Sequence, residues 1–366
     1  MDKNSIHIGK LFGIEVNLHY TWFFILALLA WSLAVSYFPT EYPGLINYNY
    51  WVLGVIAAIL LFGSVLFHEM SHSLVAKHFK IKVDSITLFF FGGVAQLKEQ
   101  EFTPKKEFWI SIVGPASSLS LAGLCFLLAY FIPNFYVQAI FGYLARLNLI
   151  LGLFNLIPGF PLDGGRVLRA ALWKKTKSLQ RATYVASEAG KAFAIFMIVF
   201  GVFRFFAGGL WYILLGLFLY TLSKATYKQT ILKTVLEKVR VKEVLSKKFK
   251  SFPHDTIITR IKVKSLLKFQ QDYFPVLKGK KILGIVSYVK ITKFQEVMKN
   301  VKVEKIMIPI KKIKVLRINE DCYSAVKKMM IQKIGVLPVV ENGKIVGILN
   351  GNSLVSLLEL DPGSKK

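Results

Sequence analysis

Cysteine is scarce in this sequence. Cys125 and Cys322 are the only two in 366 residues, so disulfides cannot form the framework of the fold. Small secreted domains held together by several disulfides are therefore excluded. Cys322 lies in the polar C-terminal part of the chain, for which we expect a reducing, cytosolic environment.

Acidic residues are also few, at 21 against 48 Lys and Arg, which gives a formal net charge of +27. Such a surplus can indicate nucleic-acid binding, but the sequence has no base-reading module, so we expect no nucleic-acid partner. Residues 40–50 lack Lys and Arg, whereas residues 77–106 and 166–181 are rich in them. This asymmetry follows the positive-inside rule and predicts cytoplasmic N- and C-termini. The rest of the surplus favours contact with anionic lipid headgroups of the bilayer.

Long apolar runs dominate the first 225 residues. The whole chain is 54% hydrophobic with a mean hydropathy of +0.48, well above the values of a soluble globular protein. Crossing the hydrocarbon core of a bilayer takes about 20 apolar residues. We therefore expect a multi-pass protein of the cell membrane with six spans, near residues 18–38, 51–76, 108–132, 136–157, 187–206 and 209–223.

The most informative motif is His68-Glu69-Met70-Ser71-His72, inside the apolar stretch at residues 51–76. Two histidines four residues apart lie on one face of a helix, so both rings can bind one metal ion. Glu69 would lie beside that metal, where it can accept a proton from a water molecule. Because ionisable residues in a membrane span are costly and usually functional, the motif predicts hydrolysis inside the membrane.

Catalytic zinc sites typically have three protein ligands, so a third ligand must lie elsewhere. Asp84 lies just outside a span, and Glu99, Glu101 and Glu107 lie among lysines in a polar stretch, where we expect solvated side chains. Asp163 differs because the prolines and glycines of residues 155–165 must break a membrane helix. Broken backbone at membrane depth is tolerated only against protein or water, which makes Asp163 the candidate.

The region at residues 1–225 resembles the site-2 protease family of intramembrane zinc metalloproteases (peptidase M50-like). The signatures of that family are His-Glu-x-x-His and a later Asn-x-x-Pro-x-x-Pro-x-Asp-Gly, and both are complete here, at residues 68–72 and 155–164. Gly114-Pro115 and the apolar hairpin at residues 89–95 fit as well. The resemblance implies one Zn2+ per chain, with His68, His72 and Asp163 as ligands and Glu69 as the general base.

The same resemblance implies an intramembrane zinc endopeptidase whose substrates are transmembrane helices of client proteins. Asn155 is then a catalytic residue that hydrogen-bonds the substrate backbone or the developing oxyanion, or else it only caps the broken backbone. The hairpin at residues 89–95 would be associated with the membrane. It would offer a strand edge to an extended substrate, or else form a buried strand without that role.

Residues 226–240 are expected to form a helical linker to two similar units at residues 241–297 and 303–360. Each unit has a short opening, a helix and two apolar strands joined by a turn, and the period near 60 residues indicates a duplication. The units resemble a CBS-domain pair, which implies a cytoplasmic α/β module that can bind an adenine nucleotide or mediate homodimer formation. The aspartate of that family's ribose contact is replaced by Lys290 and Ser353, so a structural role stays equally open.

The predicted fold class is a polytopic α-helical membrane protein with about six transmembrane helices, a membrane-associated β-hairpin and a cytoplasmic tandem CBS module that could gate the protease. Two alternatives remain. A catalytically silent membrane scaffold would bind client helices without cutting them, although it would not need both motifs intact. A CBS-regulated transporter would need ionisable residues on several spans, whereas here the acids converge on one site.

Overall fold

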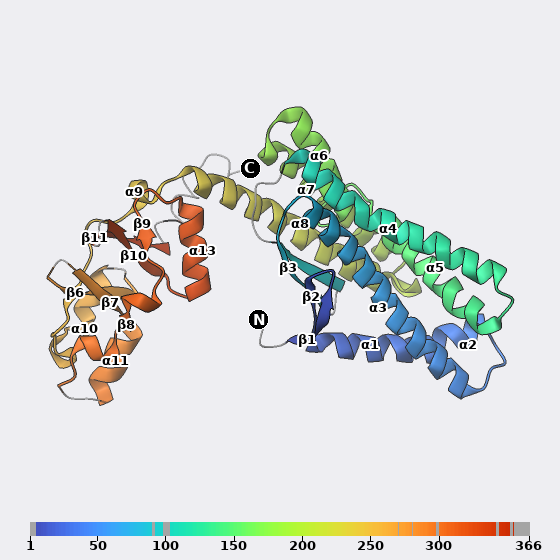
Figure 1. Cartoon of the computed structure of the whole chain (residues 1–366), viewed down its shortest axis with the longest axis horizontal. Coiled ribbons are helices and arrows are strands. Elements are labelled where there is room, and N and C mark those ends of the chain that lie inside the picture. The colour runs from blue at the N-terminus through green and yellow to red at the C-terminus, as the bar shows by residue number, and fades with distance from the viewer. Residues whose placement is uncertain are drawn as a thin grey trace. The chain divides into compact units, whose positions relative to one another are not determined.

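The computed structural model describes residues 5–89, 92–97, 103–269, 271–279, 281–297, 300–341, 344–351 and 354. The chain forms two compact units, at residues 1–228 and 229–366. The first unit is mainly helical and the second is mixed α/β (Figure 1).

Long apolar helices build the first unit. Among the described residues, five helical stretches are long and apolar enough to cross a membrane. They are α1–η1–α2 (Tyr20–Ser32, Leu33–Tyr37, Phe38–Glu41), α3 (Asn47–His78), α4 (Pro104–Phe131), α5 (Phe135–Asn155) and α7 (Leu179–Phe203). The sixth predicted span, at residues 209–223, lies within α8 (Gly209–Lys238), which does not belong to this group. The count of six spans therefore stays a prediction.

Helix packing in this unit converges around α4. The helices α4 and α5 form an antiparallel pair, and α3 packs against both of them (Figure 1). Close approach depends on small residues: a Cβ atom on Gly152 of α5 would meet the Leu119 side chain of α4 at 2.8 Å. The short helix α6 (Asp163–Thr176) packs against α4 and α7.

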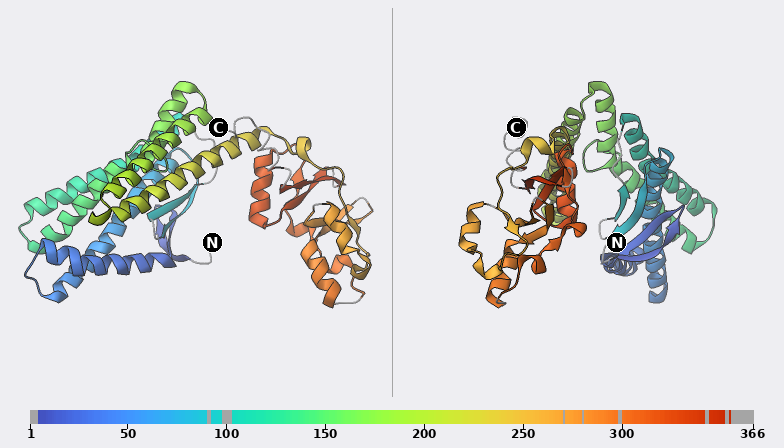
Figure 2. Two further views of the ribbon diagram at one scale, coloured as in Figure 1. Left: turned by 180° about the vertical axis from the view of Figure 1, so that it is seen from behind. Right: turned by 60° about the vertical axis from the view of Figure 1, so that its left-hand side comes forward.

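A four-stranded sheet accompanies these helices. Its order is β1 (Ser5–Leu11), β2 (Ile14–His19), β3 (Val83–Phe89) and β4 (Gly92–Leu97). The β2–β3 pair is parallel, and the other two pairs are antiparallel. Figure 2 shows the strands, blue to teal, beside α3, against which β3 and β4 pack. The predicted hairpin at residues 89–95 therefore falls on β3 and β4, although Phe90 and Phe91 lie outside the described residues.

The strands β1 and β2 were not expected from the sequence. They join through Phe12 and Gly13, both with positive φ angles, which suits a tight two-residue hairpin turn. Along β2, Ile14, Val16 and Leu18 alternate with half-buried polar residues and bury their side chains. The strand therefore covers part of the helical unit with its apolar face.

The second unit is built on one sheet with the order β5-β6-β7-β11-β10-β9, and β8 pairs with β7. Its strands are β5 (Phe252–Pro253), β6 (Tyr273–Lys278), β7 (Lys281–Ser287), β8 (Ile308–Pro309), β9 (Leu316–Arg317), β10 (Val336–Glu341) and β11 (Lys344–Asn350). The order is symmetric about the β7–β11 pair. On each side an antiparallel hairpin is followed by a parallel outer strand. Both hairpins also carry a bulge at the same place, after Val276 and after Val339.

The two halves of this sheet complete each other. A Cβ atom on Gly284 of β7 would overlap the carbonyl of Ile308, which follows the opening helix α12 (Val303–Ile306) of the second repeat. A Cβ atom on Gly347 of β11 would meet the carbonyl of Ser246, which follows the opening helix α9 (Val241–Val244) of the first repeat. Each repeat thus lays its opening segment against the strand hairpin of the other.

Three more helices flank this sheet: α10 (Val263–Leu266), α11 (Tyr288–Val297) and α13 (Cys322–Gln332). Apolar side chains form a separate core in each half. Phe252, Phe274 and Ile291 are buried in one, and Leu316, Met329 and Leu337 in the other.

Candidate metal centre

The two histidines of the first motif lie on consecutive turns of α3. Both are buried, His68 at 4% exposure and His72 at 7%. Their Nε2 atoms lie 3.1 Å apart, as expected for side chains four residues apart on one helix face. The helix therefore presents two imidazole nitrogens at one point.

Asp163 joins them from 91 residues further along the chain. The chain leaves α5 at Asn155, turns through the proline- and glycine-containing break, and starts α6 at Asp163. Its Oδ2 atom lies 3.2 Å from Nε2 of His68 and 3.1 Å from Nε2 of His72. The ligand-type atoms of the three residues all lie within 4.8 Å of one another. The structure thus brings the three predicted ligands together.

The outward ring nitrogens of both histidines have partners on α4. Nδ1 of His68 lies 2.9 Å from the Ser118 hydroxyl, and Nδ1 of His72 contacts the carbonyl oxygen of Ile110. A carbonyl can only accept, so His72 donates from Nδ1 and keeps the lone pair of Nε2 for the centre. Such contacts fix the tautomer and orientation of histidine ligands. Sequence reasoning missed Ser118 and Ile110, because no local pattern marks which residue of α4 faces α3.

This donor set fits zinc. Zinc binds imidazole nitrogen and carboxylate oxygen at about 2.0–2.2 Å, so neighbouring ligand atoms of a tetrahedral site are roughly 3.3–3.5 Å apart. The observed separations of 3.1–3.2 Å among His68, His72 and Asp163 come close to that spacing. The three residues could therefore hold one zinc ion.

Two glycines leave room at the centre. A Cβ atom on Gly114 of α4 would overlap Nε2 of His72 and lie 2.8 Å from Nε2 of His68. A Cβ atom on Gly93 of β4 would lie 2.5 Å from Cγ of Glu69. The backbone of α4 thus approaches the imidazoles, and the backbone of β4 approaches the predicted general base, because both positions lack a side chain.

Asn155 is placed differently from the predicted ligands. It is the last residue of α5, and its amide Nδ2 donates to the carbonyl of Leu151 at 3.1 Å. In this conformation the side chain hydrogen-bonds to the C-terminal turn of its own helix. A contact with substrate would require Asn155 to give up that hydrogen bond.

Arg166 also reaches the centre, although from the sequence we expected it only to contribute to the charge asymmetry that sets topology. Its Nη1 atom lies 3.8 Å from Oδ1 of Asp163, the oxygen that does not face the histidines. The spacing of three residues on α6 places both side chains on one helix face. A basic residue three positions after a candidate carboxylate ligand is a signal that could have identified it.

The expectation that Glu107 is solvated is wrong. Glu107 lies in the first turn of α4, is 1% exposed, and accepts hydrogen bonds from Arg169 of α6. The lysines beside it in the sequence, Lys105 and Lys106, do not share its face of the helix. The partner of Glu107 comes from 62 residues away, which composition alone does not reveal.

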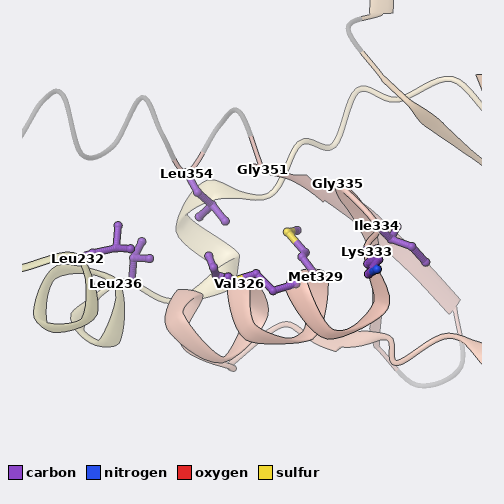
Figure 3. Close-up of a pocket in the computed structure, with 10 residues that line it drawn as sticks. Leu232, Leu236, Val326, Met329, Lys333, Ile334, Gly335, Gly351 and Leu354 are labelled. Atoms are coloured by element: carbon purple, nitrogen blue, oxygen red, sulfur yellow. The ribbon is translucent and has the colours of Figure 1, made fainter. Parts of the chain in front are cut away.

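The second unit has a cavity of about 410 Å³. Its walls are apolar apart from Lys333, and Val326 and Met329 rise from α13 toward Leu354 (Figure 3). Lys290, expected from the sequence at the position of that family's ribose-contact aspartate, donates from Nζ to the Ile306 carbonyl at 3.4 Å. Among the described residues, neither the cavity lining nor position 290 presents a carboxylate to a ribose.

Two family profiles match parts of this chain. The profile of Peptidase family M50 matches residues 56–139 and 133–197, and that of the CBS domain matches residues 303–359. Rip3 of Mycobacterium tuberculosis is 30% identical over 371 residues, covering 98% of this chain and 94% of Rip3. Zinc metalloprotease MJ0392 of Methanocaldococcus jannaschii is 30% identical over 370 residues, covering 97% of each chain.

A solved structure, the site-2 protease from Methanocaldococcus jannaschii, is 32% identical with a TM-score of 0.43, covering 61% of this chain and 95% of that one. With full-length relatives at this identity, the chain belongs to peptidase family M50, the intramembrane zinc metalloendopeptidases of site-2 protease type, and carries a C-terminal CBS module.

Proposed function

We propose that this protease hydrolyses peptide bonds within transmembrane helices of client proteins, using zinc held by His68, His72 and Asp163. The observation that carries the proposal is the convergence of two Nε2 atoms and one carboxylate oxygen within 4.8 Å. His68 and His72 belong to a helix long and apolar enough to cross a membrane. One Zn2+ per chain follows from the single cluster of this kind among the described residues.

The residues around the cluster have distinct roles in this proposal. Zinc bound there would polarise the scissile carbonyl and acidify a water molecule. Ser118 and the Ile110 carbonyl keep the two imidazoles oriented. Glu69, next to His68 on α3 and against Gly93, accepts the proton of the attacking water and delivers it to the leaving nitrogen.

Asn155 would donate a hydrogen bond to the substrate backbone or to the developing oxyanion after leaving the Leu151 carbonyl. Replacing it with alanine should then lower kcat while zinc content is unchanged. An unchanged kcat would leave Asn155 as a cap of α5.

The substrate is proposed to bind in an extended form along β4. Peptide bonds in a helix are protected by their own hydrogen bonds, so the client helix must unwind before attack. The strand β4 is the last in the order of its sheet, and its Gly93 lies against Glu69. Pairing along that edge would lead the substrate backbone to the general base. Deleting the hairpin at residues 89–95 should abolish cleavage and leave zinc binding intact; retained cleavage would refute this role.

We propose a multi-pass arrangement in the cell membrane with cytoplasmic termini and a membrane domain at residues 1–225. The linker at residues 226–240 would lead to CBS repeats at residues 241–297 and 303–360. A cysteine introduced between α2 and α3, within the stretch at residues 40–50 that lacks Lys and Arg, should react with an impermeant maleimide from outside intact cells. A cysteine in the tail should react only after permeabilisation.

The CBS tail is proposed to regulate the protease, either by gating access or by forming a homodimer. Lys290 in place of an aspartate weighs against an adenine nucleotide as its ligand, although CBS neighbours such as the MJ0100 domain pair are described in complex with S-adenosyl-L-methionine. Gating predicts that removing residues 228–366 changes turnover. Identical kinetics of both forms, with and without adenine nucleotides, would refute gating.

Cleavage of a model transmembrane substrate in detergent tests the central proposal, with wild type and Glu69→Gln compared and zinc measured in both. Zinc in both samples with cleavage by wild type alone supports the assigned roles. Zinc in both without cleavage by either would favour a scaffold that binds client helices without cutting them. Absence of zinc from both would refute the assigned ligands.

A further inference from the structure

We propose that the buried ion pair between Glu107 and Arg169 is a positioning device that holds Asp163 at the metal centre. The inference rests on the proposed function, in which Asp163 is a zinc ligand. Neither residue touches the centre itself, so both would act through the helices that carry the ligands and their partners.

The pair is buried and tightly bonded. Arg169 donates to one carboxylate oxygen of Glu107 from Nε at 2.8 Å and also from Nη2. The side chain of Glu107 is 1% exposed and that of Arg169 is 18% exposed. The guanidinium of Arg169 also lies over the Phe160 ring, 4.9 Å from its centroid. Arg169 is therefore fixed by a charge on one side and an aromatic ring on the other.

The pair joins α6, which begins with the ligand Asp163, to α4, which carries the partners of the two histidines. Arg169 lies six residues after Asp163 on α6, so its position fixes that of the helix that begins with the ligand. Glu107 lies on α4, which also provides the Ile110 carbonyl and the Ser118 hydroxyl for the histidine rings. One ion pair thus links the third ligand to the partners of the other two.

Phe160 connects the same arginine to the helix break. It is 4% exposed and lies three residues before Asp163. A Cβ atom on Gly165 would overlap the backbone of Gly159 and Phe160, so the start of α6 already rests against the break. Arg169 lies one turn further along α6. The break therefore holds the start of this short helix, and the contacts of Arg169 hold its middle.

Stability alone gives little reason for this arrangement. Burying two charges carries a large desolvation penalty for each ion, and replacing such a pair by apolar residues is often neutral or stabilising. Among the described residues, Oε2 of Glu107 is moreover buried without a hydrogen-bond partner. A pair that contributes little to stability, but joins α4 to α6 with fixed geometry, fits a positioning role.

The experiment compares zinc affinity of the full-length wild type with that of the double variant Glu107→Met and Arg169→Met. The double variant removes both charges together and leaves no uncompensated ion in the membrane domain. The matched control removes another ion pair between helices, Arg146 with Glu41, whose Nη1 and Oε2 atoms lie 3.2 Å apart. In the control both residues are changed to glutamine.

We expect the zinc Kd of the double variant to be about 10-fold higher than that of wild type, the lower end of the range found when a direct partner of a metal ligand is removed. The visible spectrum of the Co2+-loaded protein should change as well, because it reports the geometry of the ligands. The control should keep the wild-type Kd and spectrum. The single variant Arg169→Lys keeps the charge but loses the two-point contact, and should weaken zinc binding to a smaller extent.

The possible outcomes separate the two proposals. Failure of the wild type to bind zinc stoichiometrically would remove the proposed function itself. Wild-type zinc affinity and Co2+ spectrum in the double variant would overturn the positioning role and leave the pair as a packing contact. If the double variant does not fold, Arg169→Lys decides: a wild-type Kd and spectrum overturn the inference, and a raised Kd with folding intact supports it.

Discussion

Gly114 of α4 packs against His72 of α3 so closely that a Cβ atom on the glycine would overlap Nε2 of the imidazole. Gly114→Ala should therefore displace one or both rings and abolish zinc binding, which metal analysis of the purified protein would measure. The matched control is Gly123→Ala on the same helix, where a Cβ atom would meet nothing within 4 Å. Stoichiometric zinc in the Gly114 variant would show that the imidazole rings can shift to accommodate the methyl group without losing the metal, which would contradict the prediction.

Ser118→Ala removes the partner of Nδ1 of His68 while leaving all three candidate ligands in place. Loss of such a partner typically weakens metal binding by about 10- to 100-fold. We expect a rise of that size in the zinc Kd, measured by competition with a chelator. Ser120→Ala is the control, because among the described residues the Ser120 hydroxyl donates to the carbonyl of Ala116 in its own helix and has no partner on another helix. Equal affinities in the two variants would contradict an orienting role for Ser118.

Gly93→Ala tests whether β4 positions Glu69. The added methyl group would meet Cγ of Glu69 at 2.5 Å, so the carboxylate must move while the metal ligands are untouched. Displacement of a catalytic group by about 1 Å can cost 100-fold in rate. We expect zinc content to be normal and kcat to fall at least about 10-fold. Gly9→Ala in β1 should leave kcat unchanged, because a Cβ atom there meets none of the described residues within 4 Å.

Sequence reasoning reached the candidate centre because its signals are local. Spacing of four residues places His68 and His72 on one helix face, and prolines mark the break before Asp163. The contacts of Ser118 and Glu107 depend instead on the rotation of α4 about its own axis, which decides which of its residues face α3 and which face α6. That rotation is set by packing between residues 38 to 62 positions apart, which a single sequence does not display.

The fold shows the same division. Hydropathy identified all five long helices, because length and composition suffice for that; four were placed to within four residues at each end, whereas the predicted start of the fifth, at residue 187, lies eight residues after the start of α7. The hairpin of β1 and β2 was missed, although Phe12-Gly13 between two short alternating runs is a signal for it. In the second unit, the repeated strand–turn–strand pattern indicated both hairpins, whereas the contact of each opening segment with the other repeat required the structure.

Cys322 provides a test of the second unit at high pH. Burial, together with the carboxylates of Asp321 and Glu243, raises the pKa of its thiol from 9.0 to about 11. Only about 0.1% of the thiol is then ionised at pH 8, so the folded tail should react with a maleimide at least about 100-fold more slowly than the denatured chain. The variant Cys125→Ala leaves Cys322 as the only thiol to be measured.

The sign of the shift also sets the direction of a stability change. A raised thiol pKa favours the neutral form in the folded state, so its contribution is fully present below pH 9.0 and disappears as the pH rises through about 11. Cys322→Ala should flatten the decline of tail stability across that interval. Rapid labelling of Cys322 at pH 8 under native conditions would contradict its burial.

The reciprocal contacts at Gly284 and Gly347 have a consequence for biosynthesis. While the ribosome is still making the second repeat, the first has no Ile308 segment to cover β7, and its own Ser246 has no β11 to pair with. The tail therefore folds as one cooperative event only after β11 has been translated. A nascent or prematurely terminated chain would carry a finished membrane domain beside an unfolded tail, which quality-control proteases could recognise and remove.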